Sequence, residues 1–140
     1  MVHRELIYFI CTGNSCRSQM AEGFARHWVD QRYEVLSGGL SPSFVHPLAI
    51  RVMAEVGIDI SHQTSDPIDL KRLRESKVAI TLCGDAEEAC PATPPQVRRD
   101  HWPLRDPARA TGSEEEVLQV FRDVRDEIAG RVKKLLEELG

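Results

Sequence analysis

The chain has 140 residues, which is enough for one domain with a buried core of its own. Hydrophobic residues make up 41% of the sequence and charged residues 29%, and the net charge of −4 gives no reason to expect nucleic acid or an anionic membrane as a partner. Because no apolar run approaches the ~20 residues of a membrane span, we expect one cytoplasmic domain over residues 1–140, without a signal peptide.

The first predicted element is a buried strand that leads through a short loop into a helix. Residues 5–11 are largely apolar, as expected for a central strand of a parallel sheet. An amphipathic helix is predicted at residues 19–31, and we interpret its apolar stripe as core packing. The apolar residues that recur there at helical spacing are Met20, Ala21, Phe24, Ala25 and Trp28.

A second strand is predicted at residues 33–37, where Gly38 and Gly39 close it. The next helix begins at Pro47, which suits a first helical turn, and Gly57 is well placed as its C-terminal cap. The apolar stripe predicted for this helix consists of Leu48, Val52 and Val56.

The central third of the chain alternates polar stretches with short apolar ones. A short helix is predicted at residues 69–75, a buried strand at 78–82 and a short fourth strand at 97–102. Residues 84–90 are ambiguous, and a proline-rich loop follows them.

A long helix closes the sequence. Ser113 and Glu116 form a capping box that marks its start. Apolar residues then recur at close to the helical period: Val117, Phe121, Val124, Ile128, Val132, Leu135 and Leu139. Strands that alternate with helices predict right-handed crossovers, so we expect an α/β fold: a three-layer α/β/α sandwich with a four-stranded parallel sheet.

The stretch between the first strand and the first helix carries the strongest functional signal. Five residues separate Cys11 from Arg17, and this spacing lets a loop curl around one small oxyanion with its N–H groups turned inward. The residues predicted to bind the oxyanion are Thr12, Gly13, Asn14, Ser15, Cys16, Arg17 and Ser18.

Cys11 has the features of a nucleophile. Its place at a helix N-terminus beside Arg17 favours the thiolate, and Arg17 can hold two oxygens of a tetrahedral oxyanion. Ligands of parallel sheets bind beyond the carboxyl ends of the strands, where Cys11, Cys83 and Asp106 are all expected. We predict that Asp106 donates a proton to the departing oxygen, although without the loop it would be interpreted as a turn residue. For the Cys16 side chain we favour an inert core position.

Two further cysteines, Cys83 and Cys90, are seven residues apart. On a continuous helix they would be separated by about 10.5 Å, whereas a disulfide needs Cα atoms within roughly 7 Å. Gly84 at one end and Pro91 at the other weaken a helix there, so the two thiols can meet if the segment unwinds. In a cytoplasmic protein, cysteines indicate catalysis or metal binding more than structural disulfides.

The segment from Phe9 to Gly23 resembles the active-site segment of thioredoxin-coupled arsenate reductases, which share the fold of low-molecular-weight protein tyrosine phosphatases. The resemblance covers nearly the whole chain. Further matching stretches are Asp59-Ile60-Ser61, Thr64-Ser65-Asp66, residues 78–83, Cys90-Pro91, Pro94-Pro95, His101-Trp102 and Asp106-Pro107. The loop alone identifies only the phosphatase-like class, and the pair Cys83 and Cys90 points to the reductases.

The resemblance implies arsenate as substrate, with phosphate or sulfate as analogues, in arsenic detoxification. Cys11 attacks arsenate held by Arg17 while Asp106 protonates the departing hydroxide. Cys83 then attacks the Cys11 sulfur and arsenite leaves. Cys90 next forms a disulfide with Cys83, which thioredoxin reduces. Weak phosphatase activity is expected as a side reaction, and we expect a monomer without a tightly bound cofactor.

Some members of this family bind a potassium ion beside the loop. The positions that match its ligands are all oxygen donors: Asn14, Glu22, Ser37, Thr64 and Asp66. The alternative is a hydrogen-bond network that supports the loop, and for Asn14 we expect that role in either case.

Three other functions stay open at this point. A tyrosine phosphatase leaves Cys83 and Cys90 without a role, and Ala108 stands where the phosphatases usually carry an aromatic residue after Asp-Pro. A zinc module is disfavoured because the cysteine spacings are not the usual C-x2-C pairs and Arg17 would repel a cation. A regulatory redox switch would share the thiol chemistry without turnover.

Overall fold

A four-stranded parallel sheet forms the centre of the fold in the computed structural model, which describes residues 4–82 and 90–140. The strands are β1 (Glu5–Cys11), β2 (Tyr33–Gly39), β3 (Val78–Thr81) and β4 (Arg98–His101). Their order is β2-β1-β3-β4, so β1 and β3 are central strands. All three pairings are parallel, which confirms the predicted sheet.

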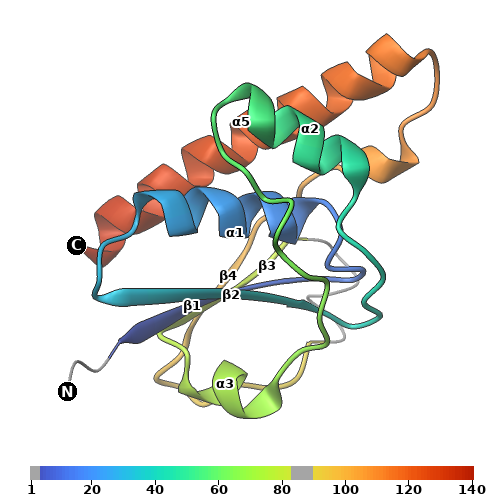
Figure 1. Cartoon of the computed structure of the whole chain (residues 1–140). Helices are drawn as coiled ribbons and strands as arrows, with labels where there is room; N and C mark the ends of the chain where they lie inside the picture. Colours follow the sequence, from blue (N-terminus) through green and yellow to red (C-terminus); the bar gives the residue numbers. More distant parts are fainter. Residues whose placement is uncertain (1–3, 83–89) are drawn as a thin grey trace.

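Helices cover both faces of this sheet (Figure 1). The helices α1 (Arg17–Trp28), α2 (Pro47–Glu55) and α5 (Glu114–Leu139) lie on one face, and α3 (Leu70–Glu75) lies on the other. A short 3₁₀ turn, η1 (Pro107–Arg109), lies between β4 and α5. The three-layer arrangement is therefore confirmed, and the capping box of Ser113 and Glu116 begins α5 as predicted.

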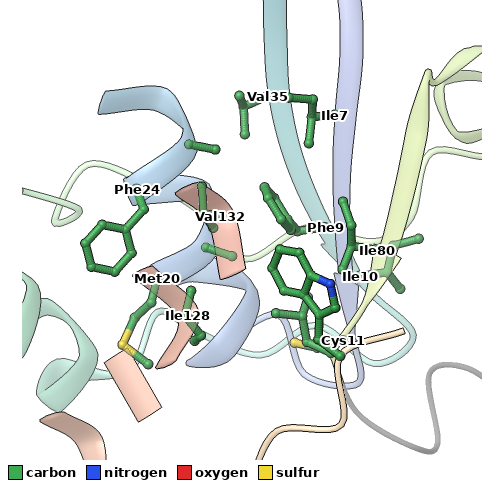
Figure 2. Packing of buried hydrophobic residues seen from close by; sticks show 14 of the residues in the cluster. Ile7, Phe9, Ile10, Cys11, Met20, Phe24, Val35, Ile80, Ile128 and Val132 are labelled. Carbon is green, nitrogen blue, oxygen red and sulfur yellow. The ribbon is translucent and has the colours of Figure 1, made fainter. Parts of the chain in front are cut away.

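The hydrophobic core lies between the sheet and the layer of α1 and α5 (Figure 2). β1 is its centre, because Ile7, Phe9 and Ile10 have no exposed surface. Met20 from α1 and Ile128 from α5 are fully buried on the side of the sheet that α1 and α5 cover. The chain therefore leaves β1 from a rigid position, which fixes the start of the loop that follows. Within residues 4–82 and 90–140, no helix combines the length and the apolar character needed to cross a bilayer.

The first helix is shifted from the predicted range 19–31. It begins at Arg17, because the Met20 N–H already donates to the Cys16 carbonyl at 3.0 Å, and it ends before Val29, whose backbone is extended. The earlier start places the positive end of α1 directly at the loop.

The predicted buried stripe of α2 is partly wrong. Val52 is buried as predicted, but the other buried residues are Ala49 and Met53, and Val56 is 45% exposed. Val56 lies beyond the last turn of the helix, so it does not share the face that packs against α1 and α5. Gly57 follows with a left-handed φ of 82°, as expected for a residue that ends a helix.

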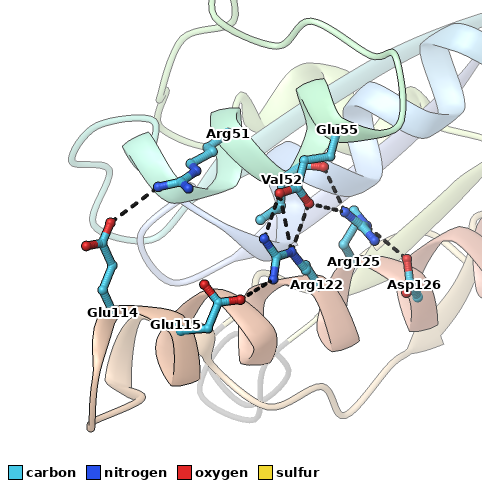
Figure 3. A network of polar contacts seen from close by, with 8 residues as sticks. All are labelled: Arg51, Val52, Glu55, Glu114, Glu115, Arg122, Arg125 and Asp126. Atoms are coloured by element: carbon cyan, nitrogen blue, oxygen red, sulfur yellow. Dashed lines mark hydrogen bonds and ion pairs between the residues drawn. The ribbon is translucent and has the colours of Figure 1, made fainter.

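An ion-pair network joins α2 to α5 (Figure 3). Arg122 donates to both carboxylate oxygens of Glu55, at 3.0 and 2.9 Å. Arg125 donates to Glu55 and to the Val52 carbonyl, at 2.9 Å in both cases. The Arg122 guanidinium, with a further contribution from Arg125, holds the pKa of Glu55 below its ordinary value. The buried charge of Arg125 is thus paired inside the fold, and α2 is fixed against α5.

Two glycines inside helices should respond in opposite directions to substitution by alanine. Gly23 in α1 is buried, and a β-carbon there would stand 2.6 Å from Ile60 Cγ2 and 3.1 Å from Met53 Cε. At Gly130 in α5, a β-carbon would meet no atom within 4 Å. We expect Gly130→Ala to raise the free energy of unfolding by about 1 kcal/mol through helix propensity. Gly23→Ala should lower it, because Ile60 is fully buried and cannot move aside.

Urea unfolding of the two variants measures both effects against the unmodified protein. A Gly23→Ala variant as stable as Gly130→Ala would contradict the close packing of α1 on Ile60.

Candidate oxyanion-binding active site

The loop between β1 and α1 turns its carbonyl groups toward the surrounding protein. The bonds run from Ser41 N–H to the Thr12 oxygen (2.8 Å), from Ser43 N–H to the Gly13 oxygen (3.2 Å) and from His46 N–H to the Ser15 oxygen (3.1 Å). In a trans peptide, the carbonyl of one residue and the N–H of the next point in opposite directions. The N–H groups that follow these carbonyls therefore turn toward the interior of the loop, where an anion would accept from them.

Gly39 allows the end of β2 to lie in close contact with the loop. A β-carbon at Gly39 would lie 2.8 Å from the Thr12 oxygen and 2.9 Å from the Asn14 nitrogen. β2 continues through Gly38 and Gly39, beyond the predicted end at residue 37, and a residue without a side chain fits the contact.

Asn14 occupies the middle of the loop in the left-handed conformation, with φ of 47°. Its side-chain Nδ2 donates to Ser18 Oγ at 2.8 Å and to Ser37 Oγ at 2.9 Å, and its Oδ1 accepts from Asp66 N–H at 2.8 Å. Asparagine tolerates this backbone conformation better than most residues, and here its side chain joins three segments. The predicted supporting role of Asn14 therefore has a direct structural basis.

The thiol of Cys11 lies at the base of the loop, and the residue is 2% exposed. Its Sγ is 2.9 Å from Ser18 Oγ. Because the Ser18 oxygen already accepts from Asn14, we assign the Ser18 hydroxyl proton to the contact with sulfur. A hydroxyl donor at this position stabilises a thiolate and makes the sulfur a better leaving group.

Arg17 closes the loop from the first turn of α1. Its Nη1 donates to the Leu104 carbonyl at 3.0 Å, and its Nη2 is 3.6 Å from Asp106 Oδ2. Its Nε is buried and has no hydrogen-bond partner in the described part of the chain. An unsatisfied buried donor of this kind is suited to an oxygen of a bound anion.

Asp106 reaches the same loop from the segment after β4. Its Oδ1 accepts the Ala108 N–H at 3.0 Å, which caps η1 and leaves Oδ2 beside Arg17. The structure thus brings Asp106 to the loop that carries Cys11 and Arg17, although Asp106 is far from both in sequence. Their catalytic roles stay predictions.

Cys16 has a different environment from Cys11. The residue is 4% exposed, and burial raises the pKa of its thiol to about 12. A thiol with this pKa stays protonated near neutral pH and is a poor nucleophile. This agrees with the expectation that the Cys16 side chain is an inert part of the core.

Of the two cysteines predicted to form the final disulfide, Cys83 and Cys90, the structure describes only Cys90. Cys83 lies outside the described residues. Leu82, the last described residue before it, donates its N–H to the Ile10 carbonyl at 2.9 Å, so the chain there lies beside the end of β1. Cys90 is described and buried, with 8% of its surface exposed.

The residues predicted to bind potassium lie together. Glu22, Ser37, Thr64 and Asp66 line one pocket of about 230 Å³, and Asn14 contacts two of them. Within the described ranges, no group of three or more His, Cys, Asp or Glu side chains is arranged to hold a metal ion.

Several of these oxygens already have partners. The two carboxylate oxygens of Glu22 accept from Arg26 Nε at 2.7 Å and from Ser37 Oγ at 2.5 Å. Asn14 Oδ1 accepts from Asp66 N–H. Arg26 therefore supplies positive charge where the ion would supply it, and the residues fit potassium only in part. The observed contacts correspond to the alternative of a hydrogen-bond network that supports the loop.

Gln19 is a supporting residue that sequence reasoning missed. Its Nε2 donates to the Asn14 and Thr64 carbonyls at 2.9 Å each, and Gln63 donates to Gln19 Oε1 at 2.8 Å. These contacts join the loop to the segment 63–66. The signal in the sequence that could have indicated these contacts is the match of Thr64 and Asp66 to the related family.

His46 and Leu104 were also missed. His46 Nδ1 accepts the Leu48 N–H at 3.1 Å and so caps α2, and burial lowers the pKa of His46, which favours the neutral ring that this cap requires. Leu104 contributes only its carbonyl to Arg17. Main-chain contacts of this kind leave no pattern in side-chain chemistry.

Comparison with known proteins gives a consistent result. The pattern of the low molecular weight phosphotyrosine protein phosphatase family matches residues 6–140. The arsenate reductase of Shouchella clausii is 52% identical over 134 residues, which cover 96% of this chain and 96% of that protein. An arsenate reductase solved in the phosphate binding state has a TM-score of 0.79 and 41% identity, covering 97% of this chain and 99% of the other. A thioredoxin-dependent arsenate reductase from Corynebacterium glutamicum has a TM-score of 0.77 and 28% identity, covering 96% of this chain and 61% of the other.

Substitution of Asn14 should test what holds the loop in shape. Asn14→Ala removes three hydrogen bonds and leaves at φ of 47° a residue that tolerates this conformation less well than asparagine, so we expect the free energy of unfolding to fall. About 3 kcal/mol is the expected loss, from roughly 1 kcal/mol for each hydrogen bond. Asn14→Gly is the control, because it loses the same bonds without backbone strain, and it should be the more stable variant by up to about 1 kcal/mol. Urea unfolding that ranks alanine above glycine would show that backbone strain is not part of the cost.

Proposed function

The chain belongs to the low molecular weight phosphotyrosine protein phosphatase family and, within it, to the arsenate reductases, and from this membership we propose that it reduces arsenate to arsenite. The observation that carries the proposal is the convergence of Cys11, Arg17 and Asp106 on one loop. The relative solved in the phosphate binding state supports a tetrahedral oxyanion as the ligand, since phosphate and arsenate share shape and charge.

In the proposed first step, the Cys11 thiolate attacks arsenic while the loop N–H groups and Arg17 hold the arsenate oxygens. A sulfur–arsenic bond forms and one arsenic–oxygen bond breaks. Asp106 gives its proton to the departing oxygen, which leaves as water. The position of Asp106 Oδ2, 3.6 Å from Arg17 Nη2, supports this role, because an oxyanion held by Arg17 would also lie beside Asp106.

In the second step, the Cys83 thiolate attacks the Cys11 sulfur. The electron pair of the sulfur–arsenic bond stays with arsenic, which is reduced from As(V) to As(III) and leaves as arsenite. The two sulfurs are oxidised to a Cys11–Cys83 disulfide, so electrons balance. Cys90 then attacks Cys83 and releases Cys11 as a thiolate, which gives a Cys83–Cys90 disulfide.

Two described contacts support this relay. The Leu82 N–H bond to the Ile10 carbonyl holds the chain that enters Cys83 beside the strand that ends at Cys11. The Ser18 hydroxyl stabilises Cys11 as the leaving thiolate when Cys90 attacks.

We propose thioredoxin as the reductant of the final disulfide. The support is the thioredoxin dependence of the related reductase from Corynebacterium glutamicum, together with the paired cysteines Cys83 and Cys90. The cytoplasmic location and the monomeric state stay predictions. Binding of potassium beside the loop also stays a prediction, and no step depends on it.

A phosphatase side activity follows from the same first step, because attack by Cys11 on a phosphate ester needs neither Cys83 nor Cys90. Ala108 beside Asp106 offers no aromatic surface to a phosphotyrosine ring, which favours a small inorganic substrate. We therefore expect phosphatase turnover to be slow.

Replacement of Cys83 separates reductase from phosphatase. Cys83→Ala should abolish arsenite production, since no thiol then attacks the Cys11 sulfur, while hydrolysis of p-nitrophenyl phosphate should persist. Arsenite is measured by speciation of arsenic in the product. Continued arsenite turnover in this variant would show that the three-thiol relay is wrong.

The reductant is tested by coupled assays with NADPH. Arsenate-dependent NADPH oxidation should proceed with thioredoxin and thioredoxin reductase, and not with glutaredoxin, glutathione and glutathione reductase. Activity with the glutaredoxin system alone would overturn the proposed coupling.

Asp106→Asn should lower kcat for arsenate by about 100-fold or more, because the amide cannot supply the proton. Its oxygen can still accept the Ala108 N–H, so the unfolding midpoint in urea should change little. Asp123→Asn, an exposed substitution of the same kind on α5, is the matched control and should leave kcat unchanged. Equal rates for both variants would remove Asp106 from the mechanism.

A further inference from the structure

Neighbouring arginines on β4 point to opposite faces of the sheet. Arg98 donates to Asp100 at 2.9 Å and to Glu138 of α5, which places it on the α5 side. Side chains alternate along a strand, so Arg99 faces the other side. There its contacts are with the main chain at Cys90 and Pro91.

The guanidinium of Arg99 holds two successive carbonyl groups. Its Nη1 donates to the Pro91 oxygen at 2.9 Å, and its Nη2 approaches the Cys90 oxygen at 3.4 Å. A planar guanidinium with two parallel donors fixes the orientation of both peptide groups, which a single-point ammonium cannot do. Cys90 itself is 8% exposed in this arrangement.

The third guanidinium nitrogen of Arg99, Nε, shows that burial of this side chain has a cost in free energy. Arg99 Nε is buried and has no hydrogen-bond partner within residues 4–82 and 90–140. A buried donor without a partner destabilises a fold, so an arginine at this place needs a compensating reason. The contacts from Arg99 to the Cys90 and Pro91 carbonyls are the favourable interactions that offset this cost.

We propose that Arg99 is a positioning residue for Cys90, which it keeps buried and correctly placed in the reduced protein. This inference rests on the proposed function, in which Cys90 resolves the Cys11–Cys83 disulfide. A nucleophile held in place has a much higher effective concentration than one on a loose chain. Arg99 therefore acts on the resolving step and leaves the attack of Cys11 on the oxyanion unaffected.

The first test uses the reduced protein without arsenate. In Arg99→Gln, which cannot hold two carbonyls in this way, alkylation of Cys90 by iodoacetamide should be at least about tenfold faster, because the main chain opens more often. The rate is followed by mass spectrometry of the peptide that contains Cys90. Arg98→Gln is the matched control, an adjacent arginine whose bonds go to Asp100 and Glu138, and it should leave the rate unchanged.

The second test follows a single turnover with arsenate, stopped in acid. In Arg99→Gln the Cys11–Cys83 disulfide should accumulate at the expense of Cys83–Cys90, while KM for arsenate and hydrolysis of p-nitrophenyl phosphate stay as in the unmodified protein. Arg99→Lys, which keeps the charge but offers a single point of contact, should fall between the two. A role in stability alone would move the urea midpoint without changing which disulfide forms.

Unchanged Cys90 alkylation, or an unchanged distribution of disulfides in Arg99→Gln, would overturn the proposed role of Arg99. Failure of the proposed function gives a different pattern, in which even the unmodified protein forms no Cys83–Cys90 disulfide with arsenate. That result would remove the relay and the role of Arg99 in it together.

Discussion

The left-handed backbone of Asn14 is the constraint on which the site depends. A single residue at φ of 47° lets the chain reverse between β1 and α1 while the carbonyls turn outward. The side chain of Asn14 stabilises this reversal through Ser18, Ser37 and the Asp66 N–H. Cys11 and Arg17 gain their relative positions from it, because each is fixed at the end of a regular element. The anion site is thus formed by backbone geometry before any ligand arrives.

The rest of the fold is arranged to hold that loop. β1 is buried on both faces, so the strand cannot shift at Cys11. β2 approaches closely through Gly39, and the segment that follows it supplies donors to the loop carbonyls. His46 at the end of this segment caps α2, which the ion pairs of Glu55 fix against α5. Support for the loop therefore extends through two helices and does not end at its immediate contacts.

Cysteines in three environments have different chemistry within one small domain. Cys11 faces a hydroxyl donor at a helix N-terminus, which stabilises negative charge on sulfur. Cys16 follows in the same loop but is buried among apolar groups, so its thiol stays protonated. Cys90 is buried beside Arg99, which donates to the main-chain carbonyls of Cys90 and Pro91. Residue type alone does not assign these roles, and the surroundings of each sulfur do.

The sequence by itself determined the strands, most of the helices and the Cys11–Arg17 loop, because hydrophobic periodicity, capping residues and motif spacing are local properties of the chain. Tertiary structure alone decided the start of α1 at Arg17, the buried face of α2 and the approach of Leu104 to Arg17. That last contact joins residues 87 positions apart and uses only a main-chain carbonyl, so no side-chain pattern records it. Such contacts depend on how the sheet brings distant segments to one edge, and that arrangement exists only once the chain has folded.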